Sequence, residues 1–496
     1  MTTKQLSLHC KTWGMLCLAG GALTMASCAQ DDLTGEKFDS GVYNTQLEAP
    51  SVDDITITPN SDGTVQTIAW PVVDGAGGYH AILKNLDNDE ILKDTLIDGI
   101  SFTAKRMEDT NYQLSLAVLD NEEKHNKGTE AVEKAFNTFT TSFQTIPAGD
   151  LATYFKENPV PEDAITEMLY YDLQPGGEYT LSENIDFRNK RVALRTPNGN
   201  NHAKITYTGK VSIKTGTLFT LKYVDIDASQ SENPVIALSE TPDENIKGLK
   251  NQIENNKETT KPSNYYNILG AITINGCNIT GVNNNLVYDS NVKYCLESLI
   301  INNSTIHLTL SSNTNISGNA VIYFKGGYAN TLQVANSTFW NTGDADAKYF
   351  VQYNNDGRAV RGGYTNSWVN FLNSTFYNIA KAGQWANYGG FNGQKCSCFD
   401  VEKCIFVDCG NKQVIRRILG GRGPATYATA ITNYNTYMFN GEFESTGGIV
   451  ETYDLSGNAI EEDPSFKDAA NGDFTVSGAA QIANKTGDPR WLPSAE

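Results

Sequence analysis

The stretches LQVANSTFWN, from Leu332, and VNFLNSTFYN, from Val369, carry the pattern that decides the fold. In both, apolar residues occupy the first, third and eighth positions, and Asn-Ser-Thr lies between them. Apolar residues two apart are typical of a strand with one buried face. Asparagine tolerates the left-handed backbone of a sharp bend and bonds to its own main chain. The stretch therefore predicts two short strands joined by a bend.

Variants of this pattern return along the second half of the chain. The seven copies are FTLKYVDIDA from Phe219, ITINGCNITG from Ile272, LIINNSTIHL from Leu299, the two quoted above, FDVEKCIFVD from Phe399 and AITNYNTYMF from Ala430. Successive copies start between 27 and 53 residues apart, so each gap is too long for a single strand. A repeat of this length indicates a solenoid or another repeat architecture.

The gaps hold a third apolar segment. These segments are LVYDS from Leu286, AVIYFKG from Ala320, YFVQYNN from Tyr349 and VIRRILGG from Val414. Three strands, a bend and a loop of variable length are typical of one coil of a parallel β-helix, whose stacked coils bury a continuous core. A propeller or sandwich would instead show four-stranded blades or hairpin turns. We therefore predict a parallel β-helix over residues 145–496, closed by a C-terminal capping segment.

A short helical cap is predicted at the start of this β-helix. Leu151, Tyr154 and Phe155 are spaced as on a helix behind Asp150, a predicted N-cap. Such a helix would cover the open end of the solenoid, whose strand edges would otherwise aggregate. In the tail, the aspartates are expected to serve turns and caps rather than a cation; they are Asp463, Asp473 and Asp488.

Residues 47–140 show a different pattern of short alternating strands. Trp70 comes early, and Tyr112 opens a late strand with apolar residues at period two. This segment resembles a fibronectin type III domain, a small β-sandwich. The fold class predicted for the whole chain is therefore all-β: a fibronectin type III-like β-sandwich followed by a right-handed parallel β-helix with a short helical N-terminal cap.

The first 27 residues read as an export signal rather than as part of the fold. Lys4 and Lys11 flank an apolar run from Trp13 to Met25, shorter than the roughly 18–20 residues of a spanning helix. Ala26-Ser27-Cys28 follows, which predicts lipidation of Cys28, with residues 28–46 as a lipidated linker. An ordinary cleaved signal with an incidental cysteine is the alternative. The acidic residues after Cys28 resemble the export tag of Bacteroidota surface lipoproteins, which implies an outer-membrane anchor facing the cell exterior.

Charge and cysteine content narrow the function further. The chain of 496 residues has 38 Lys plus Arg against 57 Asp plus Glu, a formal net charge of −19. A chain without a basic block is not expected to bind nucleic acid. Six cysteines lie beyond the linker, and their disulfide pairing stays open; they are Cys277, Cys295, Cys396, Cys398, Cys404 and Cys409. The spacing of the last four does not match paired zinc knuckles, so no metal site is predicted.

The chain as a whole resembles the pectate-lyase-like right-handed β-helix lipoproteins of Bacteroidota polysaccharide-utilisation systems, a class largely of unknown function. The export signal, the Asn-bend repeats and the NGDF and GDPRW motifs of the tail carry the resemblance. It implies a polysaccharide ligand and other glycan-uptake proteins as partners. No cofactor is certain; calcium is the one that the lyases of this fold use.

In that fold, glycan lies along the strand that follows the variable loop. By position, the resemblance places Tyr323, Lys325, Tyr353 and Arg416 or Arg417 on or near one face. A lyase needs a base beside a neutralised uronate carboxylate, and the candidate bases are Lys325, Arg358, Arg416 and Arg417. Asp356 alone would supply too few of the roughly six to eight oxygen ligands that calcium takes. The alternative to a catalytic role is that these basic residues are solvated or bond to backbone carbonyls.

Aromatic side chains are the second means of holding a sugar, because ring faces stack on pyranose C–H groups. The candidates for glycan binding are Tyr323, Tyr353, Trp340, Tyr377, Trp368 and Trp385. Trp340 and Tyr377 share one outward column of the repeat and are expected to stack. Single exposed aromatics are also common on any protein surface.

Three functions remain open from the sequence. The first is a non-catalytic surface lipoprotein that binds polysaccharide through the groove and loops of the β-helix. The second is a polysaccharide lyase or hydrolase acting on uronate-containing glycans, and the third is a structural or adhesive surface protein. The acidic composition favours a neutral glycan, or an acidic one bridged by a cation.

Overall fold

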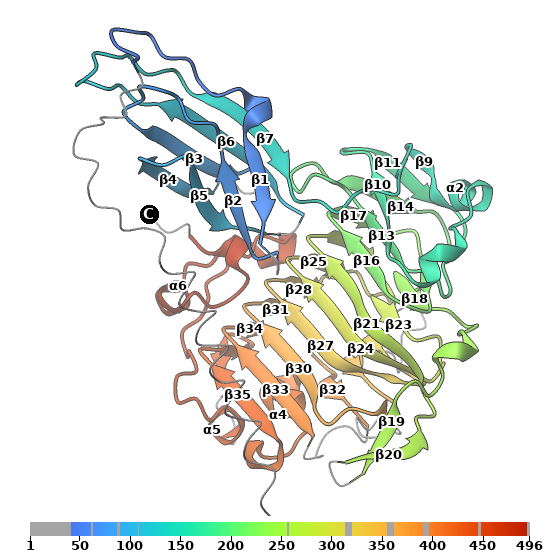
Figure 1. The fold of residues 1–496 in the computed structure, drawn as a ribbon. Helices are drawn as coiled ribbons and strands as arrows, with labels where there is room; N and C mark the ends of the chain where they lie inside the picture. Colours follow the sequence, from blue (N-terminus) through green and yellow to red (C-terminus); the bar gives the residue numbers. More distant parts are fainter. Residues whose placement is uncertain are drawn as a thin grey trace, which may run out of the picture. The chain divides into compact units, whose positions relative to one another are not determined.

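The computed structural model describes residues 41–60, 63–86, 90–107, 109–254, 257–312, 320–354, 362–389, 396–444 and 448–493. The chain divides into two compact units. The first ends at Phe136; the second runs from Asn137 onward and includes the short segments Leu86–Asp89 and Met107–Asn111. Figure 1 shows both units as strand-rich structures.

The first unit is a β-sandwich, as predicted. One sheet has the order β1-β2-β5 and the other the order β4-β3-β6-β7. The strands are β1 Thr56–Pro59, β2 Val65–Ala69, β3 Tyr79–Asn85, β4 Ile91–Ile97, β5 Ser101–Lys105, β6 Asn111–Val118 and β7 Val132–Asn137, with a short helix η1 at Val52–Asp54. Trp70 is 3% exposed and packs edge-on against Tyr79, with ring centroids 5.3 Å apart.

The second unit is a parallel β-helix of three sheets (Figure 1). The ten-stranded sheet contains β8 Gln144–Ile146, β10 Leu169–Leu173, β13 Val192–Arg195, β16 Phe219–Lys222, β21 Tyr266–Asn275, β24 Tyr294–Asn302, β27 Tyr328–Ala335, β30 Ser367–Leu372, β33 Ser397–Glu402 and β35 Thr429–Asn433. The eleven-stranded sheet contains β9 Gly149–Asp150, β11 Glu178–Leu181, β14 Ala203–Tyr207, β17 Val224–Asp227, β22 Asn278–Val282, β25 Thr305–Leu308, β28 Thr338–Asn341, β31 Thr375–Tyr377, β34 Ile405–Val407, β36 Thr436–Phe439 and β37 Glu442–Phe443. The seven-stranded sheet contains β12 Ile185–Asp186, β15 Ile213–Thr215, β18 Ile236–Leu238, β23 Val287–Tyr288, β26 Ala320–Tyr323, β29 Tyr349–Gln352 and β32 Gln384–Asn387.

The smaller elements of this unit lie in the loops and at the ends. They are α2 Leu151–Glu157, η2 Glu162–Ile165, η3 Glu244–Ile246, the hairpin β19 Asn251–Glu254 and β20 Lys257–Pro262, η4 Gly410–Lys412, α4 Val414–Ile418, η5 Pro424–Thr426, α5 Ile449–Tyr453, η6 Ala469–Asn471, α6 Ala479–Asn484 and η7 Pro489–Trp491. The predicted N-cap is confirmed, because the Asp150 carboxylate accepts the backbone N–H of Thr153 at 2.8 Å.

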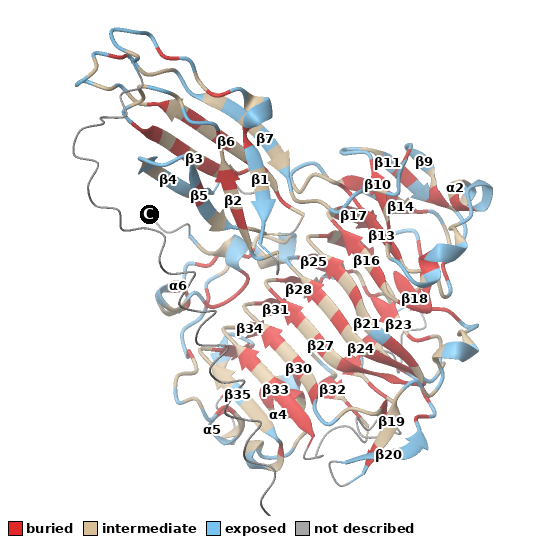
Figure 2. Cartoon of the chain, in the orientation of Figure 1, coloured by how far each residue is buried: buried red, intermediate tan, exposed pale blue. Residues whose placement is uncertain are grey.

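The repeated columns of the sequence are in register between neighbouring coils. Leu332 pairs with Val369, and Phe339 pairs with Phe376. The eighth column points into the core, where Phe339, Phe376, Phe406 and Tyr437 stack at successive centroid distances of 5.6, 5.1 and 5.7 Å. Figure 2 shows the alternation of buried and intermediate residues along these strands. The hydrophobic core is therefore one continuous column, as the repeat predicts.

The bends between the ten- and eleven-stranded sheets use left-handed backbone. Asn303, Asn336 and Asn373 have φ values of 48°, 49° and 44°. The next residue in each bend forms a ladder of its own: the Ser304 amide donates to the Ser337 hydroxyl at 3.1 Å, and the Ser337 amide donates to Ser374 at 3.2 Å. Small polar side chains thus link successive coils at the bend.

Replacing Ser337 by alanine tests this ladder. Its hydroxyl is fully buried, accepts from Ser304 N–H and donates to the Ala335 carbonyl at 2.7 Å. Loss of the hydroxyl leaves the buried Ser304 N–H without its acceptor, whereas the Ala335 carbonyl still accepts the Asn303 N–H at 3.1 Å. We therefore expect about 1–3 kcal/mol of destabilisation, measured by urea unfolding. Ser477→Ala, at an exposed serine in the tail, is the control. Equal unfolding midpoints for the two variants would contradict the ladder's role.

A helix takes the place of a strand at each end of the seven-stranded sheet. α2 contacts β12, the first strand of that sheet, and α4 contacts β32, the last. The prediction of a strand at VIRRILGG is therefore wrong. Val414, Ile415 and Ile418 are buried at helical spacing, so one face of a helix, rather than alternate residues of a strand, meets the core.

The tail returns across the outer side of the eleven-stranded sheet, and we call residues 463–493 the C-terminal strap. Its contacts step backwards through four coils. Gln481 donates to Thr436 at 3.1 Å, and Gly487 N–H donates to the Lys403 carbonyl at 2.8 Å. Asp488 N–H donates to Thr375 at 3.0 Å, and the Trp491 indole donates to Thr338 at 2.8 Å. The strap thus ties separate coils together.

The predicted turn and cap duties of the tail aspartates are confirmed. Asp488 accepts from Arg490 N–H at the start of η7, and Asp463 accepts from Ser465 N–H at 2.6 Å. Asp473 accepts from Thr475 N–H and pairs with Lys467 at 2.8 Å.

Candidate functional site

One register position of the seven-stranded sheet forms a row of polar and aromatic side chains. The row contains Asp186, Lys214, Ala237, Tyr288, Tyr323, Gln352 and Asn387. All except Ala237 are partly or fully exposed. The residues one position earlier, from Ile185 to Ala386, are apolar and at most 6% exposed. The strands therefore bury one row in the core and present the next to the outside.

Tyr288 and Tyr323 lie at the middle of this row. Their rings stack with centroids 5.5 Å apart and planes 27° apart. Ala237, the neighbour of Tyr288 on the other side, has no side chain long enough to cover its ring. Burial, helped by the charge of Asp289, raises the pKa of the Tyr288 phenol to about 12. Both phenols therefore stay neutral near pH 7 and can donate and accept hydrogen bonds.

Two clefts meet at this tyrosine pair. One has a volume of about 210 Å³ and is lined by Pro234, Asn284, Asn285, Tyr288, Tyr323 and Lys325. The other has a volume of about 140 Å³ and is lined by Tyr323, Phe324, Lys325, Gln352, Tyr353, Asn354 and Asn387. The clefts share Tyr323 and Lys325, so they adjoin; we call the two together the hollow, which lies over β23, β26, β29 and β32.

Asp289 holds the wall of this hollow in place. Its carboxylate is fully buried and accepts backbone N–H groups from Lys325 at 2.9 Å and from Gly326 and Gly327 at 2.8 Å. It also accepts from Asn291 N–H at 2.9 Å. Burial raises the pKa of Asp289 to about 6, although these amide bonds favour the charged form. The turn that carries Lys325 is therefore fixed by a buried acceptor behind it.

A third cleft lies at the opposite ends of β29 and β32, beside α4. Its volume is about 220 Å³, and it is lined by Lys348, Ala382, Gly383, Gln384, Gly410, Asn411, Gln413 and Arg417. The ammonium of Lys348 lies 5.4 Å from the ring centre of Tyr349. Arg416, the neighbour of Arg417, instead bonds Gln413 at 2.9 Å. We call these three clefts the trough.

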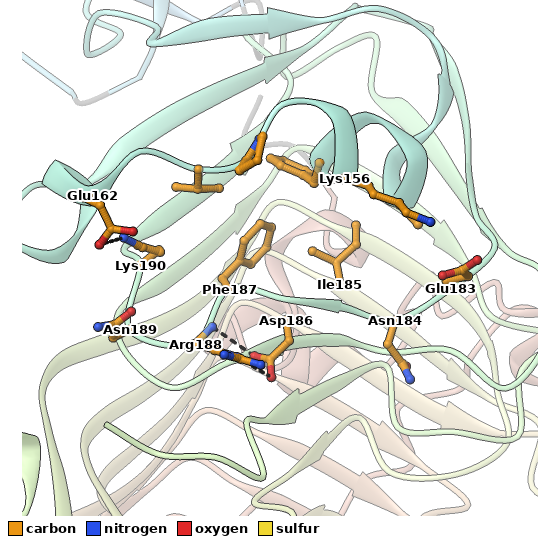
Figure 3. Close-up of a pocket in the computed structure, with 14 residues that line it drawn as sticks. Lys156, Glu162, Glu183, Asn184, Ile185, Asp186, Phe187, Arg188, Asn189 and Lys190 are labelled. Carbon is orange, nitrogen blue, oxygen red and sulfur yellow. Dashed lines mark hydrogen bonds and ion pairs between the residues drawn. The ribbon is translucent and has the colours of Figure 1, made fainter. Parts of the chain in front are cut away.

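Another cleft of the second unit lies at the first coil, between α2 and β12 (Figure 3). Its volume is about 580 Å³. Ile185 and Phe187 point toward the helix, whereas Asn184 and Asp186 point to the other side of the strand (Figure 3). Lys190 pairs with Glu162 at 2.5 Å. The charged lining of this cleft is balanced; it comprises Lys156, Arg188, Lys190, Glu162, Glu183 and Asp186.

The prediction that Tyr353 and Trp385 offer their rings to a sugar is corrected, because both side chains are buried. Trp385 is fully buried and packs against Phe350, with centroids 4.6 Å apart. Tyr353 is 1% exposed and packs against Tyr388 beneath the second cleft. Both rings are part of the core, so neither offers a face to a sugar. Tyr323 alone of the six lies in the trough with an accessible side chain.

The remaining three aromatics lie on other sheets. Trp340 and Tyr377 are register partners on the eleven-stranded sheet, but Trp340 stacks on His307 at 4.6 Å, not on Tyr377. Phe474 of the C-terminal strap contacts both rings. Trp368 is half-buried on β30, in the ten-stranded sheet. The expected stacked pair of Trp340 and Tyr377 is therefore replaced by a histidine–tryptophan pair next to the strap.

The predicted bases are only partly brought together. Lys325 is exposed in the trough, and Arg417 lines its third cleft. Arg416 and Arg417 come from α4 rather than from a strand. Arg358 lies outside the described residues, as do Asp356, Cys28 and the predicted signal peptide.

The described residues do not fit a calcium ion. Calcium takes about six to eight oxygen ligands, usually with several carboxylates. Among the described residues, no three acidic, histidine or cysteine side chains converge on one point. The described lining of the trough contains no carboxylate. The six cysteines are all buried, and no disulfide joins them.

Three family models match successive parts of the chain. Residues 1–175 are similar to DUF4992, residues 177–342 to DUF4957 and residues 369–491 to DUF5123, each a domain of unknown function. The first match ends between β10 and β11, so it includes the β-sandwich and the first strands of the β-helix. The function must therefore be argued from the site itself.

No curated protein matches the chain. Among solved structures, it is similar to the fn3 domain of the human collagen alpha-1(XX) chain, determined in solution. The identity is 16%, the match covers 22% of this chain and 96% of that chain, and the TM-score is 0.17. Within the described residues, no helix has the length and apolar character needed to cross a bilayer.

Proposed function

We propose that this protein is a non-catalytic, lipid-anchored outer-membrane surface protein that binds polysaccharide in the trough. The anchor is the lipid on Cys28 that the sequence predicts, and the partners are the polysaccharide and other glycan-uptake proteins. The observation that carries the binding proposal is the stacked pair of Tyr288 and Tyr323 in a row that crosses seven strands.

The tyrosine pair supplies the apolar contact that sugars need. Pyranose rings expose C–H groups on their faces, and aromatic rings bind these groups by stacking. Tyr288 is partly exposed beside the short side chain of Ala237, and Pro234 and Tyr323 complete the first cleft. A sugar unit in this cleft would contact a ring face, while the phenol hydroxyls reach its own hydroxyl groups.

Amide side chains supply the polar contacts. Asn284, Gln352 and Asn387 are partly exposed in the lining of the hollow. An amide presents both a donor and an acceptor, which matches a sugar hydroxyl. The row advances by one strand, about 4.8 Å, per coil, so equivalent positions recur along an extended chain. This repetition favours a polymer over a small molecule as the ligand.

The lyase alternative has less support. Its proposed bases Arg416 and Arg417 lie on α4, and no carboxylate lines the described trough to hold calcium beside them. No contact of the described residues favours the purely adhesive alternative over glycan binding. Both alternatives stay outcomes of the experiment below.

The test is glycan retention by the soluble protein lacking residues 1–28. Affinity gels with plant and host polysaccharides should retain the wild type. Tyr323→Ala and Tyr288→Ala should each weaken retention at least about fivefold, because a stacking contact of about 1–1.5 kcal/mol is lost. Tyr266→Ala, at a partly exposed tyrosine of the ten-stranded sheet, is the matched control and should bind normally.

The outcomes separate the three functions. Retention that depends on Tyr323 but not on Tyr266 supports binding in the trough. New absorbance of unsaturated uronates during incubation would favour the lyase. If no polysaccharide is retained and none is cleaved, the glycan proposal is wrong and the adhesive alternative gains.

A further inference from the structure

The trough differs in charge from the rest of the protein. The chain has a formal net charge of −19. Yet the described lining of the trough has three cationic side chains, Lys325, Lys348 and Arg417, and no acidic one. The cleft beside α2, at the other end of the same sheet, has equal numbers of both signs. Of the clefts compared on this sheet, those of the trough carry an excess of positive charge and the cleft beside α2 does not.

We propose that the glycan bound in the trough is anionic, and that its carboxylate or sulfate groups pair directly with Lys325, Lys348 and Arg417 without a bridging metal ion. The inference rests on the glycan-binding function proposed above and names its ligand class. Arginine pairs with planar carboxylates and with sulfates through two parallel hydrogen bonds, and lysine acts as a point charge.

The described acids form no ion pair with these three cations. The closest in sequence to Lys348 is Asp346, which is partly buried beside the third cleft and accepts the Ala382 N–H at 2.7 Å. Glu240 pairs with Lys214 at 3.0 Å, further back along the row.

The Asp289 carboxylate is buried behind the wall, and its described contacts are four backbone N–H groups. Asp289 therefore fixes the turn that carries Lys325 through backbone bonds. It does not pair with the ammonium group of that lysine, which lines the trough. An anion in the trough would meet cationic side chains that have no carboxylate partner in the described lining.

This inference differs from the expectation drawn from composition, which favours a neutral glycan or a cation-bridged acidic one. Net charge acts at long range and is screened beyond about 8–10 Å at physiological salt, whereas contacts in a cleft depend on the nearest groups. A chain that is acidic overall can therefore hold an acidic polymer where its surface is locally basic. In the described lining the positive charge comes from side chains, and no carboxylate there could hold a bridging metal ion.

Two matched pairs of polymers test the inference. Polygalacturonate is compared with its fully methyl-esterified form, and dextran sulfate with dextran, all in EDTA and low salt. Within a pair the backbone is the same and only the charge differs. We expect the wild-type protein to bind at least one charged polymer about tenfold more tightly than its neutral partner. This preference should fall as salt is raised.

Charge-removing variants locate the effect. Lys325→Gln and Arg417→Gln should each weaken binding of the charged polymer about two- to fivefold, and the double variant about tenfold, because each exposed pair contributes modestly. Binding of the neutral partner should fall less than binding of the charged polymer, because only the latter loses an ion pair. Lys261→Gln, at an exposed lysine on β20, is the control and should match the wild type.

The outcomes distinguish this inference from the function beneath it. The polymer pair with the preference identifies carboxylate or sulfate as the recognised group. Equal binding of charged and neutral partners, with loss only in Tyr323→Ala, would overturn the anionic class but keep glycan binding. Loss in Lys261→Gln as large as in Lys325→Gln would overturn the inference as non-specific attraction. Absence of all binding would overturn the proposed function itself.

Discussion

Replacing Asp488 by alanine is expected to lower the free energy of unfolding of the β-helix by about 3 kcal/mol. The carboxylate is 1% exposed, accepts the Thr338 hydroxyl at 2.7 Å and pairs with Arg490 at 3.0 Å. Removing one partner of a buried, hydrogen-bonded ion pair leaves the other uncompensated, which costs about 3–5 kcal/mol. Because Arg490 is partly exposed, the lower end of that range applies.

The measurement is urea unfolding followed by circular dichroism, with tryptophan fluorescence as a local probe. Trp491 bonds Thr338, the same hydroxyl that Asp488 holds, so release of the strap should change its emission before the β-helix unfolds. Asp473→Ala is the control, since that aspartate is partly exposed and its partners among the described residues all lie within the strap. An unfolding midpoint for Asp488→Ala equal to that of Asp473→Ala would contradict this account.

Glu444 is expected to make the protein less stable as the pH rises. It is 2% exposed, and neither carboxyl oxygen has a well-formed hydrogen bond among the described residues. Burial raises the pKa of Glu444 to about 8; the Val414 amide and Lys412 lower it in part, and Asp408 raises it. Because the folded state holds the proton more tightly, this stabilisation is complete below the unfolded pKa and is lost as the pH rises through 8.

Glu444→Gln should remove this dependence. At about 1.4 kcal/mol for each pKa unit, the wild type should lose on the order of 4 kcal/mol between pH 4.5 and 9 from this group alone. The glutamine variant should unfold at a higher urea concentration than the wild type at pH 9. Glu442→Gln, at an exposed glutamate two residues earlier, should follow the wild-type profile. Parallel profiles for wild type and Glu444→Gln would show that Glu444 does not titrate in this range.

The strands that repeat could be predicted because seven copies define the columns. Each copy tests the assignment of the others, so inward Phe339 and Phe376 followed directly from the pattern. The third strands have no shared motif. A shift of one residue moves a side chain to the other face of a sheet, and the sequence alone does not exclude such a shift. This is why the sequence places Tyr353 on the outer face although it lies in the core. Trp385 is expected in a loop, whereas it lies on β32 and packs into the core.

Two other differences have separate causes. The run from Val414 to Leu419 is short, and its apolar residues fit a helix better than a strand, a signal that spacing could have revealed. Trp340 and Tyr377 do share an outward column, but Phe474, nearly a hundred residues later, packs on them. No local pattern predicts which distant segment covers a sheet.

Only part of the candidate site can be predicted from the sequence. Tyr323 and Lys325 follow from the position of their strand, whereas Tyr288 was overlooked. Aligning LVYDS with AVIYFKG places Tyr288 opposite Tyr323, the register that the structure shows. Lys348, Gln384 and the buried Asp289 leave no such signal, because their roles depend on which loop lies behind which strand.

The two helices α2 and α4, which take the place of strands, also mark the two ends of the seven-stranded sheet and so define its length. The span between them equals the number of intervening coils multiplied by the strand spacing, about 4.8 Å per added coil. Duplicating one repeat of about thirty residues would therefore lengthen the outer face of that sheet by one strand spacing and leave α2 and α4 in place at its two ends. Size in this architecture is counted in whole units, so a relative with more or fewer coils should differ in reach by discrete increments rather than by gradual change.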